Sequence, residues 1–348
     1  MTRISNAILT LSALLVFPLV LSAQSTSFAS AMELFQHRQW EEAAKAFAEC
    51  ESSNPGKTDA LLYRGKSLIN LGQFDSAGNA LQSYRETHSN SDDAAYLLAY
   101  VRFRQNQPED SLRLFTDAAK LRAPTADDLK IVALDYVLFS DFEDAAHYLE
   151  LALRMDPANV EARYHLGRVR YQQNRFDLAI EAFQEVLRRD PTNVKAQDNL
   201  GLSLDAENKT DAAIAAYRKA IEVDAAAAVH SEQPYLNLGM LLARSNQLDQ
   251  AIPLLVRASE FAPKSCKAHY ELGKAYFSSN RLQDAQREAE RAVSLEAGDR
   301  PSHYLLGRIY QRIGKAELAA QEFRKTDEMI HENENKPGNG MASGVNPK

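Results

Sequence analysis

Glycine, proline, cysteine and tryptophan are all scarce in this 348-residue sequence, which contains 14, 12, 2 and 1 of them. Few glycines and prolines, beside abundant Ala, Leu, Glu, Gln and Arg, favour helices over turns and sheets. The two cysteines, Cys50 and Cys266, cannot make a disulfide framework, and neither belongs to a CxxC or Cys/His cluster that would bind zinc. We therefore expect no metal site and interpret both thiols as small packing residues.

The sequence also lacks an excess of basic residues: 40 Lys and Arg stand against 47 Asp and Glu, and the formal net charge is −7. An acidic chain lacks the basic footprint of a nucleic-acid-binding protein, so we exclude that class. Catalytic signatures such as HExxH and GxSxG are absent as well. The segment 54–58 resembles the end of a phosphate-binding loop, but Glu51 stands where that loop needs its first glycine. The sequence therefore predicts no enzyme, no catalytic residue and no cofactor.

A long apolar run is found at the start of the chain, where Arg3 precedes the stretch Ala7–Leu21. The small residues Ser22 and Ala23 follow it. A cationic start, an apolar core and a small-residue cleavage site together predict a secretory signal peptide over residues 1–23.

The alternative is an uncleaved membrane anchor. We favour cleavage, because the apolar run is short for a membrane span and Pro18 interrupts it. A lipid anchor is not expected, since Gln24 stands where the lipoprotein signal has a cysteine. The expected location is therefore outside the cytoplasm, periplasmic or extracellular, with anchoring by the uncleaved segment as the alternative.

A Leu-Gly pair recurs every 34 residues, with one spacing of 38, and its glycines are Gly167, Gly201, Gly239, Gly273 and Gly307. Steps of 34 back from the first of them reach four more small residues, Ala133, Ala99, Gly65 and Ala31. Sixteen residues after each of the nine lies Phe47, Leu81, Phe115, Leu149, Phe183, Tyr217, Leu255, Ala289 or Phe323. One phase held over nine units indicates a repeat architecture.

The pattern resembles the tetratricopeptide repeat, a 34-residue helix-turn-helix unit with a Leu-Gly pair, a later Ala, an aromatic residue and a closing proline. The resemblance covers residues 24–333, with units starting near residues 24, 58, 92, 126, 160, 194, 232, 266 and 300. It implies an all-α fold, a right-handed superhelical solenoid of about nine helix pairs. The family's early Trp is missing from every unit, and Arg163, His269 and His303 are among its replacements.

Elementary packing explains why such units stack. A helix pair cannot bury its own apolar face, so each unit covers the next and the core runs along the array. The small residues are expected where two helix backbones approach most closely. A second small residue, such as Ala145 or Ala179, follows twelve residues after each of the nine, and the larger side chain four residues after it should lie on the same face of the second helix, one turn further on.

Two irregularities interrupt the pattern. The unit of 38 residues carries an extra run at 225–231, and four residues are about one helical turn, so its second helix is expected to gain a turn. Pro253 falls inside an expected helix, but at little cost if that helix begins near Leu248 and the proline lies in its first turn. Past these units, residues 334–348 read as a disordered tail.

In tetratricopeptide arrays the first helix of each unit lines a concave groove, and the resemblance carries this role to aromatic and cationic residues of four units. They are Tyr96, Tyr100, Phe103 and Arg104, then Tyr164, Arg168 and Tyr171, then Tyr270, Lys274 and Phe277, and last Tyr304 and Arg308. Such a face suits an extended peptide, above all one with acidic groups. Tyrosine also recurs at these places in the repeat whatever the ligand, so the alternative is a purely structural role.

The function expected from the sequence is a non-catalytic protein-interaction scaffold in the cell envelope or outside the cell. Its partners would be other proteins or extended peptides bound in the groove. The alternative is an accessory subunit of an envelope polysaccharide synthesis or secretion assembly.

Overall fold

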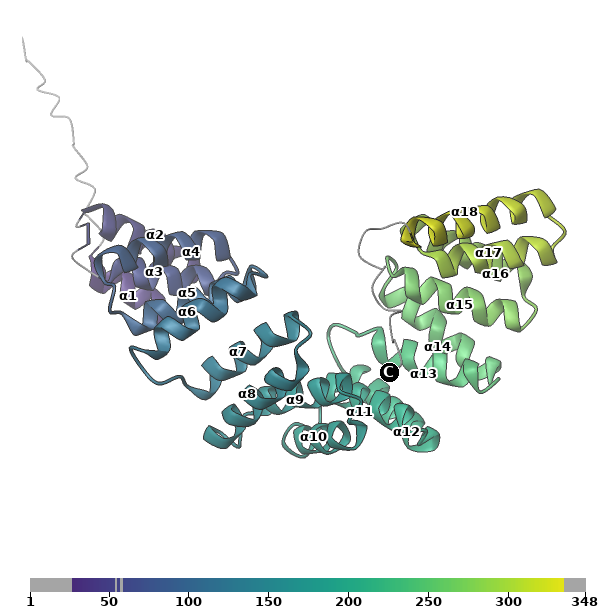
Figure 1. Cartoon of the computed structure of the whole chain (residues 1–348), viewed down its shortest axis with the longest axis horizontal. Helices are drawn as coiled ribbons and strands as arrows, with labels where there is room; N and C mark the ends of the chain where they lie inside the picture. Colours follow the sequence, from purple (N-terminus) through teal and green to yellow (C-terminus); the bar gives the residue numbers. More distant parts are fainter. Residues whose placement is uncertain (1–26, 54, 57–58, 335–348) are drawn as a thin grey trace, which may run out of the picture. The chain divides into compact units, whose positions relative to one another are not determined.

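The computed structural model describes residues 27–53, 55–56 and 59–334, and over these residues the chain forms eighteen α-helices and no strand (Figure 1). The helices come as nine pairs, which confirms the expected all-α repeat fold. The first helices of the pairs are α1 (Phe28–Gln36), α3 (Ala60–Asn70), α5 (Asp92–Arg104), α7 (Ala126–Leu138), α9 (Val160–Gln172), α11 (Val194–Ala206), α13 (Gln233–Arg244), α15 (Cys266–Ser278) and α17 (Arg300–Arg312). The second helices are α2 (Trp40–Ser53), α4 (Phe74–Thr87), α6 (Pro108–Ala119), α8 (Phe142–Met155), α10 (Phe176–Arg189), α12 (Thr210–Asp224), α14 (Leu248–Phe261), α16 (Leu282–Leu295) and α18 (Ala316–Glu334).

The chain divides into two compact units, one ending at Ala123 and the other beginning at Pro124. The first unit contains α1–α6 and the second contains α7–α18. The predicted signal peptide lies outside the described residues, and so does the predicted tail of 334–348 except for Glu334, which ends α18. No helix in the described part of the chain is long and apolar enough to cross a membrane.

The turn inside each pair has one backbone solution. The second residue after each first helix has a positive φ, and these residues are Arg38, Gly72, Asn106, Ser140, Asn174, Asn208, Asn246, Asn280 and Gly314. The next residue donates its N–H to the carbonyl of the residue five positions earlier, as Asp141 does to Tyr136 at 2.9 Å. This is the Schellman ending of a helix, which favours glycine or asparagine at the left-handed position. The repeat is therefore visible in the backbone conformation of the turns as well as in the pattern of side chains.

The other end of most first helices is closed by a side-chain cap. Ser27, Ser91, Thr125, Asn159, Asn193, Ser265 and Asp299 each accept a hydrogen bond from a backbone N–H in the first turn. Each cap satisfies one of the amides that the start of a helix leaves without a partner. The sequence therefore fixes where these helices begin through a short polar residue.

The small residues of the repeat do create close helix packing, but their neighbour is usually a large side chain. A Cβ added to Gly201 would lie 2.6 Å from the ring of Tyr217, sixteen residues later. Backbone meets backbone closely at Gly273, where Ala289 replaces the large residue and its amide nitrogen is 3.3 Å from such a Cβ. At most of these positions the space left by the glycine is thus filled by a ring or a leucine side chain of the second helix.

The expected extra turn in the long unit is wrong. Helix α12 has 15 residues against 14 in α10, and residues 225–232 form a connecting segment instead. The buried carboxylate of Asp224 ends the helix, because it accepts the backbone N–H of Ser231 at 2.8 Å and lies 3.1 Å from Nδ1 of His230. These contacts hold the connecting segment against the helix end, where alanine propensity alone would have continued the helix.

The interpretation of Pro253 also needs correction. Helix α14 does begin at Leu248, but Pro253 is its sixth residue and lies beyond the first-turn amides that have no intrahelical partner. The proline therefore removes an internal hydrogen bond, and the helix continues through it to Phe261.

Within each compact unit, the first helices pack more closely on one another than the second helices do. In the second unit α7 contacts α9, and the contacts continue through α11, α13 and α15 to α17. In the first unit α1 contacts α3, and α3 contacts α5. Between second helices the backbones do not come this close in the described part of the chain, and α12 and α14 are linked by a side-chain hydrogen bond from Arg218 to Gln250 at 3.5 Å. The row of first helices is thus the more crowded, inner side of each unit, and we call it the inner wall.

Candidate functional site

The twelve residues predicted to line a groove all lie on first helices, in three groups. One group is on α5 of the first unit, one is on α9, and one is shared by α15 and α17 of the second unit. Five of them, Tyr270, Lys274, Phe277, Tyr304 and Arg308, line one pocket of about 520 Å³. We call it the C-terminal pocket, and its remaining lining residues are Ser278, Asn280, Leu305 and Arg312.

Aromatic rings and cations are interleaved in the C-terminal pocket. The guanidinium carbon of Arg308 lies 5.0 Å from the centre of the Phe277 ring, and Nζ of Lys274 lies 5.6 Å from that of Tyr270. Tyr304 is 51% exposed, with its ring 5.9 Å from that of Phe323. The pocket therefore offers accessible aromatic surface with positive charge beside it.

The charge of this pocket is unbalanced. Lys274 donates to the carboxylate of Glu271 at 2.9 Å, which offsets one positive charge. Arg308 and Arg312 are exposed, and no hydrogen bond or ion pair engages either guanidinium among the described residues. Two unpaired guanidinium groups at one pocket favour an anionic ligand, because each can donate two parallel hydrogen bonds to a carboxylate.

The group on α9 is separate from this pocket, with α11 and α13 between them along the inner wall. Tyr164 is half-buried against the Phe183 ring, and its hydroxyl accepts a hydrogen bond from Asn199 of α11 at 3.3 Å. Burial raises the pKa of Tyr164. Arg168 is exposed, whereas Tyr171 packs its ring against Phe176 at 5.3 Å. The structure therefore leaves Arg168 and part of Tyr164 available on the wall.

A buried polar pair joins α11 and α13, the two first helices that follow α9. Asp198 of α11 is 5% exposed, and Asn237 of α13 donates to both of its carboxylate oxygens at 3.0 and 3.1 Å. Burial raises the pKa of Asp198 to about 6, and the hydrogen bonds from Asn237 only partly oppose this rise. Asp198 occupies the repeat position of Tyr164 and Tyr270, and here that position joins two helices.

In the first unit the α5 group forms a cluster of its own. Arg104 donates to the hydroxyl of Tyr100 at 2.6 Å, and its guanidinium carbon lies 4.3 Å from the ring centre of Phe74 on α4. The ring of Phe103 lies 6.4 Å from that of Tyr100. Arg104 is exposed, so this cluster presents a cation held between two rings.

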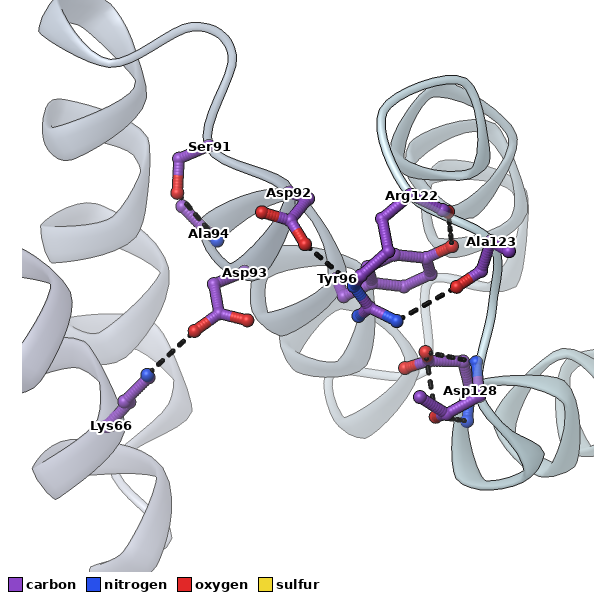
Figure 2. A network of polar contacts seen from close by, with 10 residues as sticks. Lys66, Ser91, Asp92, Asp93, Ala94, Tyr96, Arg122, Ala123 and Asp128 are labelled. Carbon is purple, nitrogen blue, oxygen red and sulfur yellow. Dashed lines mark hydrogen bonds and ion pairs between the residues drawn. The ribbon is translucent and has the colours of Figure 1, made fainter.

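Tyr96 is not a groove residue, which corrects its assignment. Its hydroxyl donates to the carbonyl of Arg122 at 2.8 Å, and the Arg122 guanidinium carbon lies 4.3 Å from its ring centre. Figure 2 shows the Arg122 side chain folded back over Tyr96 and reaching Asp92, to which its Nε donates at 2.6 Å. Tyr96 is 5% exposed as a result. Arg122, in the segment after α6, therefore covers the ring of Tyr96.

Family models agree with this repeat architecture. Tetratricopeptide repeat models match residues 34–99, 133–194, 194–226, 242–309 and 301–329. The chain belongs to the tetratricopeptide repeat family. Repeats of this family generally serve as non-catalytic scaffolds that bind other proteins or peptides, and this chain has their fold.

Several known tetratricopeptide proteins are similar to the chain. BBSome complex member BBS4 of Bos taurus is 23% identical over 267 residues, which are 76% of this chain and 44% of that protein. The chain thus spans less than half the length of this relative. Yeast Tom70 superposes with a TM-score of 0.56 at 20% identity, over 85% of this chain and 62% of that one.

Two further solved structures share the fold. The APC/C hetero-tetramer Cut9-Hcn1 gives a TM-score of 0.58 at 14% identity, over 80% of this chain and 54% of that one. The C-terminal part of a repeat-containing protein from Cytophaga hutchinsonii gives 0.56 at 18% identity, over 71% of this chain and 99% of that one. At these identities the likeness concerns the fold alone.

The C-terminal pocket contains residues that the sequence analysis missed, notably Arg312, Ser278 and Asn280. A signal for Arg312 was present, because it occupies the same repeat position as Arg104, which was predicted. Asn280 gave none, because it lies in the turn after α15 and owes its place to a positive φ. Over the described residues, no group of three or more His, Cys, Asp or Glu side chains could hold a metal ion.

Proposed function

We propose that this chain is a non-catalytic scaffold that binds other proteins through the inner walls of its two compact units. The observation that supports this most is the C-terminal pocket, where three exposed or half-exposed rings stand beside two guanidinium groups that have no hydrogen-bond or ion-pair partner among the described residues. Tyr and Arg are the side chains that most often dominate the energy of protein interfaces. The α9 group and the α5 cluster add further aromatic and cationic contact points.

The proposal has a direct test in three double variants, one for each group. These are Tyr100→Ala/Arg104→Ala, Tyr164→Ala/Arg168→Ala and Tyr304→Ala/Arg308→Ala. A partner captured by the tagged wild-type chain in its native host would be titrated against each of them. We expect at least one double variant to lose about 2 kcal/mol of binding energy, which is roughly 30-fold in Kd.

Arg324→Ala is the matched control, because Arg324 is exposed on α18 and does not line the C-terminal pocket. It removes the same charge as an Arg308 substitution and should leave binding unchanged. Circular dichroism would verify equal helix content in all variants. Partner binding that is unaffected in all three double variants would place the interaction away from the inner walls and end the proposal.

We further propose that the chain works outside the cytoplasm, in the cell envelope or secreted, since residues 1–23 have the composition of a signal peptide. The mature protein should then begin at Gln24, which N-terminal sequencing of the exported form would establish. A retained Met1 in a membrane fraction would favour the uncleaved anchor. An accessory role in envelope polysaccharide synthesis or secretion is the more specific alternative, and it requires the captured partner to belong to such an assembly.

A further inference from the structure

We propose that His269 and His303 are two proton-dependent clamps, which hold the last two helix pairs together while their rings are charged and release them as the rings lose a proton. The two residues occupy the same place in the repeat, where the family's early Trp would stand. The proposal concerns the stability of α15–α18, so it stands apart from the partner that the chain binds.

The His303 ring lies between two oxygen acceptors that belong to different segments of the chain. Its Nδ1 is 2.5 Å from a carboxylate oxygen of Glu322 on α18, and its Nε2 is 3.1 Å from the carbonyl oxygen of Ala297, in the connection before α17. His303 is 3% exposed, so water does not replace either acceptor. The ring therefore ties α17 both to the connection before it and to the helix after it.

His269 has the same arrangement one unit earlier. Its Nδ1 is 2.8 Å from a carboxylate oxygen of Glu288 on α16, and its Nε2 is 3.3 Å from the carbonyl oxygen of Pro263, before α15. The side chain of His269 is 12% exposed. In both units the acid follows the histidine by 19 residues and the carbonyl precedes it by six. Because the contacts recur at the same spacing, they follow from the geometry of the repeat.

The charge state of the rings follows from their partners. A carboxylate and a carbonyl only accept hydrogen bonds, so both nitrogens of each ring must donate, and only the imidazolium has two N–H groups. Burial opposes ionisation of Glu322, but hydrogen bonds from Lys325 and His303 outweigh it and lower the pKa of that carboxyl. Glu322 is therefore ionised and cannot supply a missing hydrogen. A neutral ring would direct a lone pair at one of the two oxygens.

The other charged groups on the surrounding segments already have partners. Around His269, α16 contributes Arg287, whose Nε lies 3.7 Å from the second carboxylate oxygen of Glu288, and Arg291, which donates to the Pro263 carbonyl at 3.3 Å. Around α17 the engaged groups are Lys325 with Glu322, Glu290 with Tyr310, Glu271 with Lys274, and Asp299 with Ser302. Among the described residues, no further ion pair or hydrogen bond reaches either ring.

The direction of the pH effect follows from this geometry. Folding gives the charged ring an acceptor for each of its two N–H groups, so the folded chain favours the proton. In the unfolded chain an ordinary histidine loses its proton near pH 6.5. The contribution of the clamps is therefore complete in mild acid and is lost as the pH rises and the folded rings lose their protons, because each then faces an oxygen with a lone pair.

The clamps act on the helices that carry the C-terminal pocket. Tyr270 and Tyr304, which line it, directly follow the two histidines in the sequence. Most of the other lining residues also lie on α15 and α17. Release of the clamps therefore loosens this pocket and leaves the helices at the other end of the second unit unchanged.

Hydrogen exchange of the full mature chain between pH 5 and pH 8, corrected for the intrinsic rate at each pH, tests the proposal. The variant is His269→Gln/His303→Gln, since Gln197 occupies the same repeat position in α11 and does not titrate. We expect the ratio of wild-type to variant protection in α15–α18 to fall at least about tenfold from pH 5 to pH 8.

Helices α9 and α10 serve as the internal reference. There the clamp position holds Arg163, which stays charged and donates to the Pro157 carbonyl six residues earlier at 3.2 Å. Burial lowers the pKa of His165 on α9 to about 4, so this ring is neutral over the tested range. The protection ratio in α9 and α10 should therefore be constant. The matched control is His147→Gln on α8, which removes an exposed histidine and should leave the ratio constant in every helix.

A second variant, Glu288→Gln/Glu322→Gln, keeps both histidines and removes their acids. It should lose the same pH-dependent protection in α15–α18, and it keeps the test decisive if the histidine variant does not fold. A ratio for α15–α18 that is constant or rises with pH would overturn the proposal. So would a glutamine variant of the two acids with the full pH dependence of the wild-type chain.

Discussion

Asp198 is a carboxylic acid that folding withdraws from water without giving it a cation. Its two oxygens accept from the amide of Asn237, which is a neutral donor, and Glu232 adds a repulsive negative charge. The ionised form is therefore disfavoured in the folded chain, and the pKa rises from 3.8 to about 6.

The raised pKa has a defined consequence for stability. Between pH about 4 and about 6 the folded chain holds a proton at Asp198 that the unfolded chain has released, so this group's contribution to stability falls as pH rises through that window. The loss is up to about 3 kcal/mol. In Asp198→Asn the amide does not titrate and can still accept from Asn237. Urea unfolding at pH 4 to 8 should show a gain of the variant over wild type that grows with pH; parallel curves would refute this.

Residues at one repeat position can have unrelated roles, and this limits what the sequence predicts about the site. Tyr96, Tyr164, Asp198 and Tyr304 are equivalent in the repeat. Periodicity placed them all on first helices correctly. It could not show that Arg122, 26 residues after Tyr96, folds back over that tyrosine, nor that Asp198 finds an amide 39 residues away. Such contacts depend on side chains outside the pattern.

At the scale of the helix pair, the residue with positive φ in each turn is conformationally strained wherever it is not glycine. Ser140 has φ 60° and is exposed, while Gly314 fills the equivalent place with φ 80°. A non-glycine residue in this region is strained by roughly 1–2 kcal/mol, and asparagine tolerates it better than serine. Four consecutive hydrogen-bonded turns from Asn174 to Asn280 accordingly use asparagine.

A reciprocal pair of substitutions tests this cost. Ser140→Gly should stabilise the α7–α8 pair by about 0.5–1 kcal/mol, since part of the relieved strain is offset by a more flexible unfolded chain. Gly314→Ser should destabilise α17–α18 by about 1–2 kcal/mol, and no atom lies within 4 Å of the added Cβ, so the effect is conformational and not steric. Hydrogen exchange of the two pairs would measure both. Changes of the same sign would contradict the turn assignment.

Helix pairs were the part of the fold that the sequence predicted best, because the spacing of Gly167, Gly201 and their equivalents records a contact that every pair needs. The connecting segment at 225–232 was not predicted, because its course depends on the buried carboxylate of Asp224. Its alanines favour a helix by propensity. The hydrogen bonds of Asp224 to His230 and Ser231 stabilise the connecting segment instead.

At the scale of the whole molecule, each helix packs only on helices one or two places away in the chain. No contact in the described part of the chain skips further, so the array lacks the long-range pairings that make an ordinary domain unfold as one body. Stability should then be a sum over pairs and their interfaces, with damage passing from a pair to its neighbours and fading beyond them.

Gly201→Leu tests this directly. The Tyr217 ring already lies 2.6 Å from where a Cβ would stand, so leucine must push α11 and α12 apart, at a cost of about 3 kcal/mol or more. Hydrogen exchange should accelerate in α11 and α12, less in α10 and α13, and not in α17 and α18. The control is Gly78→Ala, whose new Cβ would be 3.4 Å from Val101 and whose helix should gain up to about 1 kcal/mol. Uniform acceleration across residues 126–331 in the Gly201 variant would show that the second unit unfolds cooperatively, and the additive picture of its repeats would have to be abandoned.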